Sequence, residues 1–331
     1  MDELERRLRA ARPVSGNRRL PLTDRAKREL ADLIIAESHN SPKRRPRWLA
    51  SSRILGLAAV LVLVVSATLL WPTAGQSALA APPPLVIEPI ASNGADELDA
   101  LATAAATSQQ FSNVPAPGEE VTIRMQTWVM HMQEVDGDLD PALTVVSPEN
   151  TVTSLRPDGS RSAVATAGIP YDAAGKVAST KVAPGTVLWT LEHGPGEYQR
   201  LFDEPAPRDS EQMGPFLSLA TGVDVTQDAS SAFLAVGSLL TEQKLDAVQT
   251  SALIEFLGTL PDYKVAGTAT DRLDRPALVL TAVRPGDQYT DYLLLDRVSG
   301  AVLAIESVYT GDTRSDLSSP TVMSYSAWER D

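Results

Sequence analysis

The chain has 331 residues, of which 43% are hydrophobic and 21% are charged, and its formal net charge is −13. This length and apolar content allow at least one sizeable core and exclude a chain that is disordered throughout. The absence of cysteine excludes disulfide frameworks, thiolate catalysis and cysteine-ligated zinc sites.

Charge divides the chain into two parts. Residues 1–53 hold 14 Lys and Arg against 7 Asp and Glu, so their net charge of +7 leaves −20 for the residues that follow. The acidic part has no basic patch interleaved with aromatic residues, and we therefore expect no direct binding of nucleic acid.

Residues 1–47 predict a short helical stub. Residues 2–11 have the spacing of one short helix, and a second helix is expected from the N-cap Thr23 to about Glu37. The second helix has an apolar stripe beside basic side chains, and this stripe is the candidate partner-binding surface. Its residues are Leu30, Leu33, Ile34, Arg25, Lys27 and Arg28. Because two short helices bury too little surface to fold firmly alone, the stripe either contacts a partner or belongs to a loosely helical leader that only sets topology.

Residues 48–72 predict one transmembrane helix. Ile54 to Trp71 are uncharged and mostly apolar, and a helix of this length nearly covers a bilayer core of about 30 Å. Lys and Arg gather before the segment and none follows it until Arg124, which predicts a cytoplasmic N-terminus. The alternative is a cleaved signal peptide, because Ala78-Leu79-Ala80 has the A-x-A pattern, but signal peptides have shorter leaders.

Residues 73–91 predict a proline-rich stem that is extended and lifts the next domain away from the membrane. Residues 92–331 then form the expected extracytoplasmic domain. It begins with an alanine-rich helix at 95–110, followed by strands at 120–133, 143–155 and 161–167. The sequence Arg156-Pro157-Asp158-Gly159 predicts a hairpin turn between the last two.

The second half of this domain predicts a helical block at about 209–261 and then a meander of strands. The helices are expected at 213–220, 229–240 and 245–260, and the strands at 263–270, 277–283, 289–295, 301–309 and 321–328. This order is typical of an α+β fold, an antiparallel curved sheet with its helices on one face.

Catalytic and metal-binding patterns are missing from the sequence. It has three histidines, His39, His131 and His193, and none belongs to a recognised catalytic motif. The carboxylates at 136–140 depart from a calcium loop, because its sixth position is Pro141 and its twelfth is Ser147. We therefore expect a protein that is not an enzyme and uses no cofactor or metal; an envelope hydrolase is the last-ranked alternative.

Several segments together resemble a family of single-pass membrane proteins of high-GC bacteria that are often encoded beside extracytoplasmic-function sigma factors. They are MDELERRLRA, TDRAKRELADLIIA, the apolar segment, TVTSLRPDGSRS, LIEFLGTLPDYKVAGTATDRLDRPALVL and DYLLLDRVSGAVLAIESV. The resemblance implies the bacterial cell membrane and a sigma factor as cytoplasmic partner. The stub departs from a full anti-sigma domain, because it is shorter and lacks a zinc-binding set of His and Cys.

The segment LLLDRVSGAVLAIE is also similar to the half-barrels of lipoprotein carriers and periplasmic stress sensors, in which a curved sheet wraps a helical plug and accepts acyl chains. The leading hypothesis is an envelope-associated regulator or sensor whose outer domain binds a ligand or an envelope protein. The alternative is a membrane-tethered carrier for a lipid, a lipoprotein or another apolar ligand.

Overall fold

The computed structural model describes residues 80–116, 118–130, 145–286, 288–314 and 317–329. The expected stub at 1–47 and the transmembrane helix at 48–72 lie outside these residues, as do Leu30, Leu33, Ile34, Arg25, Lys27 and Arg28. Among the described residues, no helix is both long and apolar enough to span a bilayer. The described domain falls within one compact unit of the chain, Pro72–Asp331.

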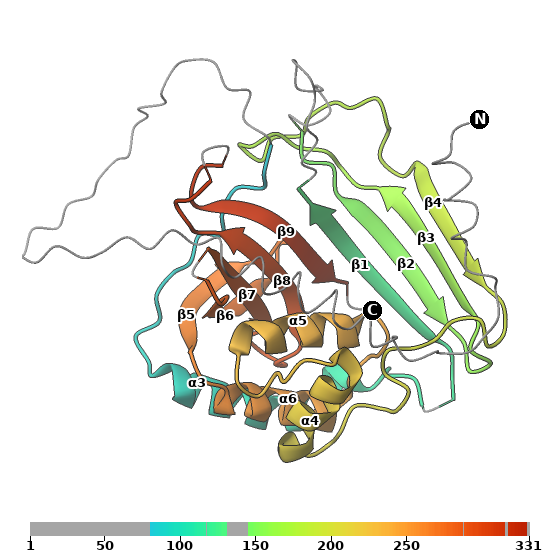
Figure 1. Cartoon of the computed structure of the whole chain (residues 1–331), viewed down its shortest axis with the longest axis vertical. Helices are drawn as coiled ribbons and strands as arrows, with labels where there is room; N and C mark the ends of the chain where they lie inside the picture. Colours follow the sequence, from blue (N-terminus) through green and yellow to red (C-terminus); the bar gives the residue numbers. More distant parts are fainter. Residues whose placement is uncertain (1–79, 117, 131–144, 287, 315–316, 330–331) are drawn as a thin grey trace, which may run out of the picture. The chain divides into compact units, whose positions relative to one another are not determined.

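The domain is α+β and is built on one open antiparallel sheet of nine strands, shown in Figure 1. The strands are β1 (Val121–Val129), β2 (Glu149–Leu155), β3 (Arg161–Ala167), β4 (Val187–His193), β5 (Tyr263–Thr270), β6 (Pro276–Val283), β7 (Tyr289–Asp296), β8 (Val302–Tyr309) and β9 (Thr321–Trp328). Their order in the sheet is β4-β3-β2-β1-β9-β8-β7-β6-β5. Two meanders therefore meet where β1 pairs with β9, and the sheet has free ends at β4 and β5.

Four α-helices accompany the sheet: α3 (Gly94–Ala106), α4 (Ser210–Thr221), α5 (Ala229–Leu240) and α6 (Ala247–Thr259). A short 3-10 turn at Gln109–Phe111 follows α3. Asp209, Asp228 and Asp246 are N-caps whose carboxylates accept backbone N–H groups of the first turns of α4, α5 and α6. Each helix of the expected helical block therefore begins with an aspartate N-cap.

The helices pack on one face of the sheet, as expected. The larger core cluster combines helix residues such as Phe233 and Ile254 with sheet residues such as Leu280 and Leu293. The smaller cluster contains Val279, whose side chain alternates with its neighbours to the opposite face, and no α-helix residue. Helix α5 contacts β6, β7 and β8, whereas none of the four helices makes more than a marginal contact with β2, β3 or β4.

The stem differs from its expected role as a spacer. Its described part, from Ala80 on, packs on the second face of the sheet, where Ala80, Leu85 and Ile87 contact the smaller core cluster. Glu88 pairs with Thr268 of β5 through two backbone hydrogen bonds of 2.8 Å. The apolar side chains in a proline-rich segment explain the difference, because they gain more from burial than the stem gains from hydration.

Strand β4 is missing from the sequence expectation, and β2 begins at Glu149 rather than at 143. The remaining strands and helices lie within a few residues of their expected ranges. The expected turn at Arg156-Pro157-Asp158-Gly159 is present: Gly159 has a φ of 77° and Arg156 N–H donates to Ser160.

Candidate binding site at the free edge of the sheet

The two end strands of the sheet are protected differently. At β5, the stem pairs with Thr268 and so occupies part of the edge. Gly267 permits this approach, because a Cβ at this position would lie 2.1 Å from the carbonyl oxygen of Glu88. Strand β4 has no such partner among the described residues. An uncovered edge strand presents unpaired N–H and C=O groups to any extended chain.

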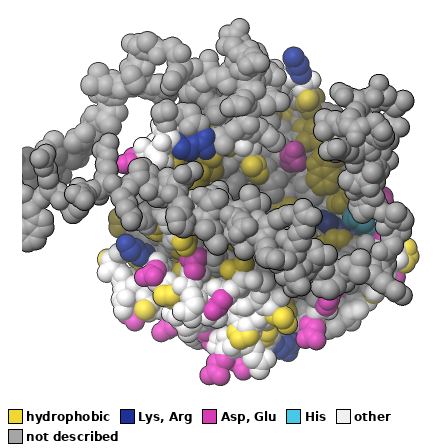
Figure 2. Space-filling view, viewed as in Figure 1, with side chains coloured by type: hydrophobic (Ala, Val, Ile, Leu, Met, Phe, Trp, Pro, Cys, Tyr) yellow, Lys and Arg dark blue, Asp and Glu magenta, His cyan; other side chains and the backbone are white. Residues whose placement is uncertain are grey.

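Strand β4 is exposed along nearly its whole length although it is largely apolar. The exposed fractions are 55% for Val187, 40% for Leu188, 41% for Trp189 and 36% for Leu191. Such side chains on an open edge are typical of an interaction surface. Figure 2 shows a hydrophobic area on the visible face, with basic and histidine atoms close to it.

The register of the ladder shows which backbone groups of β4 face outward. Ala167 N–H donates to Thr186 and Gly168 N–H donates to Pro148, so alternate residues of β3 point to opposite neighbours. Because Ala163 pairs with Leu191 and Ala165 pairs with Trp189, these residues of β4 bond to β3. The N–H and C=O groups of Thr190 and Glu192 therefore point away from the sheet.

A polar corner lies where β3 begins and β4 ends. Arg161 is directly opposite His193 in the ladder. The guanidinium carbon of Arg161 lies 4.6 Å from the ring centre of Tyr198, and the rings of His193 and Tyr198 are 5.6 Å apart. Arg161 Nε and His193 Nδ1 are both buried, and neither has a hydrogen-bond partner among the described residues.

Glu242 fixes Tyr198 in this corner. Its carboxylate accepts the Tyr198 hydroxyl at 2.5 Å and the backbone N–H groups of Leu201 and Phe202 at 3.0 Å. Burial and the bond to Glu242 raise the pKa of Tyr198 to about 12. Because this carboxylate is already bonded, the phenol is a neutral donor that is engaged within the protein.

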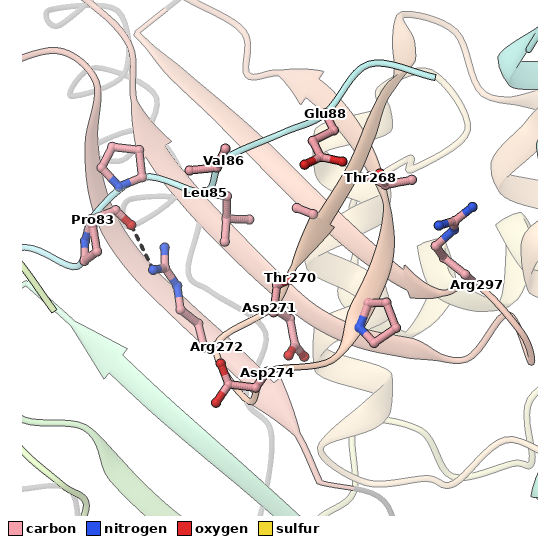
Figure 3. A pocket seen from close by; sticks show the side chains of 13 residues that line it. Pro83, Leu85, Val86, Glu88, Thr268, Thr270, Asp271, Arg272, Asp274 and Arg297 are labelled. Carbon is pink, nitrogen blue, oxygen red and sulfur yellow. Dashed lines mark hydrogen bonds between the residues drawn. The ribbon is translucent and has the colours of Figure 1, made fainter. Parts of the chain in front are cut away.

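A groove of about 490 Å³ lies between the stem and the β5–β6 hairpin, and Figure 3 shows its lining. Arg272 closes one side: its Nη1 donates to the Pro83 carbonyl at 2.8 Å, while Nε and Nη2 bind both oxygens of the fully buried Glu306 at 2.8 and 2.7 Å. The ion pair of Arg272 and Glu306 thus holds the stem on the sheet.

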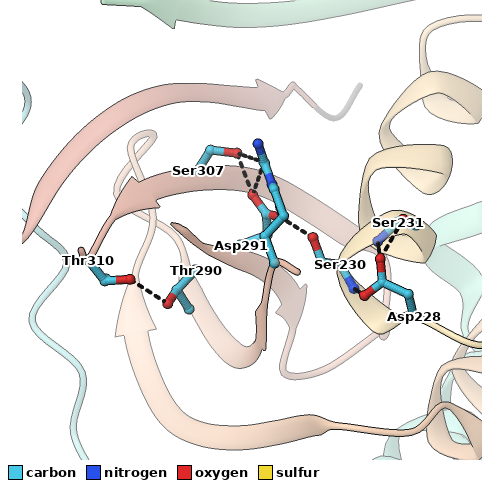
Figure 4. Close-up of polar contacts among 8 residues, drawn as sticks. Asp228, Ser230, Ser231, Thr290, Asp291, Ser307 and Thr310 are labelled. Atoms are coloured by element: carbon cyan, nitrogen blue, oxygen red, sulfur yellow. Dashed lines mark hydrogen bonds and ion pairs between the residues drawn. The ribbon is translucent and has the colours of Figure 1, made fainter. Parts of the chain in front are cut away.

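A second buried carboxylate, Asp291, joins helix α5 to the sheet, as Figure 4 shows. It accepts the hydroxyls of Ser230 and Ser307 and two N–H groups of Arg284, at 3.1 and 2.7 Å. A Ser beside an Asp is part of several catalytic sites, but catalysis also needs a base within reach. Here both hydroxyls donate to the carboxylate, and the other described partner is the guanidinium of Arg284, which is no base; this arrangement fits a structural network.

The described residues contain no group of three or more His, Asp or Glu side chains arranged to hold a metal ion. His131 and the carboxylates at 136–140 lie outside the described residues, as does His39. His193, for which the sequence indicated no catalytic role, ends β4. Arg161 and Trp189 were missed: the apolar run VLWTL before a Gly-Pro-Gly turn could have indicated the strand that carries Trp189, whereas the place of Arg161 depends on strand pairing.

No family model, no curated protein and no solved structure matches this chain.

Proposed function

We propose that the chain is a non-enzymatic, single-pass membrane protein, an envelope-associated regulator or sensor whose extracytoplasmic domain binds an extended segment of a protein at the edge of β4. The supporting observation is that β4 combines outward backbone groups, which no described strand pairs, with exposed apolar side chains. A partner strand would form hydrogen bonds with these backbone groups and cover the apolar side chains. The partner of the stub, proposed to be a sigma factor, would contact Leu30, Leu33 and Ile34.

The test uses the full chain in its own membrane. A photo-crosslinking phenylalanine analogue replaces Leu188 at the β4 edge, or, as a control, Leu219, which is 87% exposed on α4. We expect adducts from position 188 that Thr190→Pro lowers about tenfold, because proline removes the outward N–H and blocks strand addition. Equal adduct yields with and without Thr190→Pro would contradict the proposal.

A second variant separates loss of binding from loss of fold. Leu191→Pro removes an N–H that bonds to β3, so it should disturb the ladder itself, whereas Thr190→Pro should leave the circular dichroism spectrum unchanged. A Thr190→Pro protein that melts like Leu191→Pro would show that this position is needed for folding.

The second candidate function is binding of an apolar ligand on the helix side of a curved, half-barrel-like sheet. It is favoured by a row of small buried side chains on this face of β2 and β3, Thr151, Thr153, Ala163 and Ala165, away from the main helix contacts. Native mass spectrometry of the gently extracted full chain tests it. A lipid-sized mass that remains bound would favour the carrier, and a protein free of such mass would count against it.

A further inference from the structure

The corner of Arg161 and His193 has polar groups that the described residues leave unpaired. Arg161 has no acidic side chain within ion-pair distance in the part of the chain that the structure describes. Its guanidinium lies over the ring of Tyr198. Buried polar atoms without a hydrogen-bond partner are rare in folded proteins, and each one needs a physical explanation. Two of them, Arg161 Nε and His193 Nδ1, lie on residues that face each other across one ladder position.

The side chains around this corner that the structure describes do not supply the missing acceptor. The carboxylate of Glu242 already accepts the Tyr198 hydroxyl and two backbone N–H groups. Glu197 accepts the backbone N–H of Gly194 at 2.6 Å, within its own turn. A guanidinium beside an imidazole and an aromatic ring is suited to an external carboxylate, because both nitrogen groups can donate to it.

We propose that this corner selects a partner strand that carries an Asp or Glu side chain opposite His193. The inference rests on the proposed strand addition at β4 and names its specificity. Every pairing in the sheet is antiparallel, so an added antiparallel strand would begin near His193 and run toward Val187. Its side chains on the helix side would meet, in order, His193, Leu191 and Trp189, which predicts one acidic residue followed by apolar residues at alternate positions.

A peptide fits these observations better than a lipid does. The outward N–H and C=O groups of Thr190 and Glu192 need hydrogen-bond acceptors and donors at a regular spacing. An extended polypeptide supplies both, whereas an acyl chain supplies neither.

The experiment selects random dodecapeptides from a display library on the full chain, held in phosphatidylcholine nanodiscs. We expect peptides that alternate apolar and polar residues, with Asp or Glu before the apolar positions. Exchanging that acid for its amide in a selected peptide should weaken binding about tenfold, the effect of one lost charge-assisted hydrogen bond. Arg161→Gln should remove the preference for the acid while the apolar alternation persists.

Two arginine variants serve as controls. Arg161→Lys keeps the charge and should retain most of the acid preference. Arg297→Gln changes an exposed arginine at the β7–β8 turn and should select the same peptides as the original chain. The substitution of Asp or Glu by its amide in the peptide needs no variant of the protein. It therefore tests the preference for an acid even if Arg161→Gln fails to fold.

The outcomes separate this inference from the proposed function. Selected peptides without enrichment of acids, or the same acids on Arg161→Gln, would overturn the acidic preference and leave strand addition standing. Selection of no peptide by any variant would overturn both. Displacement of acid-bearing peptides by palmitate but not by hexadecanol would assign the corner to an anionic lipid and overturn the peptide assignment.

Discussion

Arg272 and Glu306 form a bidentate ion pair inside the sheet. Glu306 has no exposed side-chain surface, and Arg272 is 11% exposed. Burial raises the pKa of Glu306, and the charge and hydrogen bonds of Arg272 oppose this rise. The pair therefore depends on both partners, since either one alone would be a buried charge without compensation.

We predict that Arg272→Met lowers the free energy of unfolding by about 3–5 kcal/mol, because it leaves Glu306 buried and unpaired. The double variant Arg272→Met/Glu306→Leu should recover most of this loss, since an apolar pair of similar volume removes the stranded charge. Urea denaturation followed by circular dichroism measures both. A double variant no more stable than the single one would contradict this account.

Tyr198 offers a pH-dependent test of the corner beside β4. Its raised pKa of about 12, against an ordinary value of 10.0, means that the folded state holds this proton more tightly than the unfolded state. The stabilisation is complete below pH 10, and it is lost as the pH rises from 10 to about 12. Stability in this range therefore falls with pH.

We predict that Tyr198→Phe removes one phenolate from the ultraviolet titration, and that the difference between the two titration curves has its midpoint near pH 12. The variant should also lose less stability between pH 10 and 12 than the original chain does. A difference curve centred at pH 10 would show that Glu242 and burial do not hold the proton.

The contact between the stem and β5 depends on one residue, Gly267. Gly267 has a φ of 145°, and a Cβ there would meet the carbonyl of Glu88 at 2.1 Å. We predict that Gly267→Ala breaks the bridge to Thr268 and speeds amide exchange at Glu88 at least tenfold, as hydrogen–deuterium exchange would measure. Unchanged protection at Glu88 would count against the stem contact.

Gly258 provides the matched control for Gly267. It lies in helix α6, and a Cβ added there has no atom within 4 Å. Gly258→Ala should leave the stem protected and raise the free energy of unfolding by about 0.5–1 kcal/mol, because alanine is the better helix former.

The sequence expectations succeeded where apolar runs are separated by clear turn residues. Strands β6 to β8 are largely buried apolar runs bounded by turns, and helices α4, α5 and α6 begin at capping Asp residues. Strand β4 was missed because both of its faces are exposed, so VLWTLEH has no alternation of apolar and polar residues. The period of two carries information only where one face is buried.

The candidate site was harder to predict than the fold because it depends on pairing between strands. Arg161 and His193 become opposite residues through a register that shifts between Ala165 and Thr166. A bulge of this kind leaves no clear mark in one sequence. The packed stem was missed for a similar reason, since its proline content indicated extension and gave no sign of the surface it contacts.

At the scale of the whole molecule, charge predicts how the chain is placed. Lys and Arg gather before the apolar segment and none follows it until Arg124, which predicts that the stub stays in the cytoplasm and the described domain lies outside. Because the chain contains no cysteine, a single introduced cysteine reports the side of the membrane on which it lies.

We predict that Ala173→Cys, at an exposed turn of the described domain, reacts with a membrane-impermeant maleimide in intact spheroplasts, whereas Ser15→Cys in the stub reacts only after the membrane is opened. The reverse pattern would place the acidic domain in the cytoplasm. Recovery of Ala173→Cys in the soluble fraction, without residues 1–80, would instead support cleavage after Ala80. In either case the β4 edge would meet a different set of partners, so this labelling decides where the partner strand is to be sought.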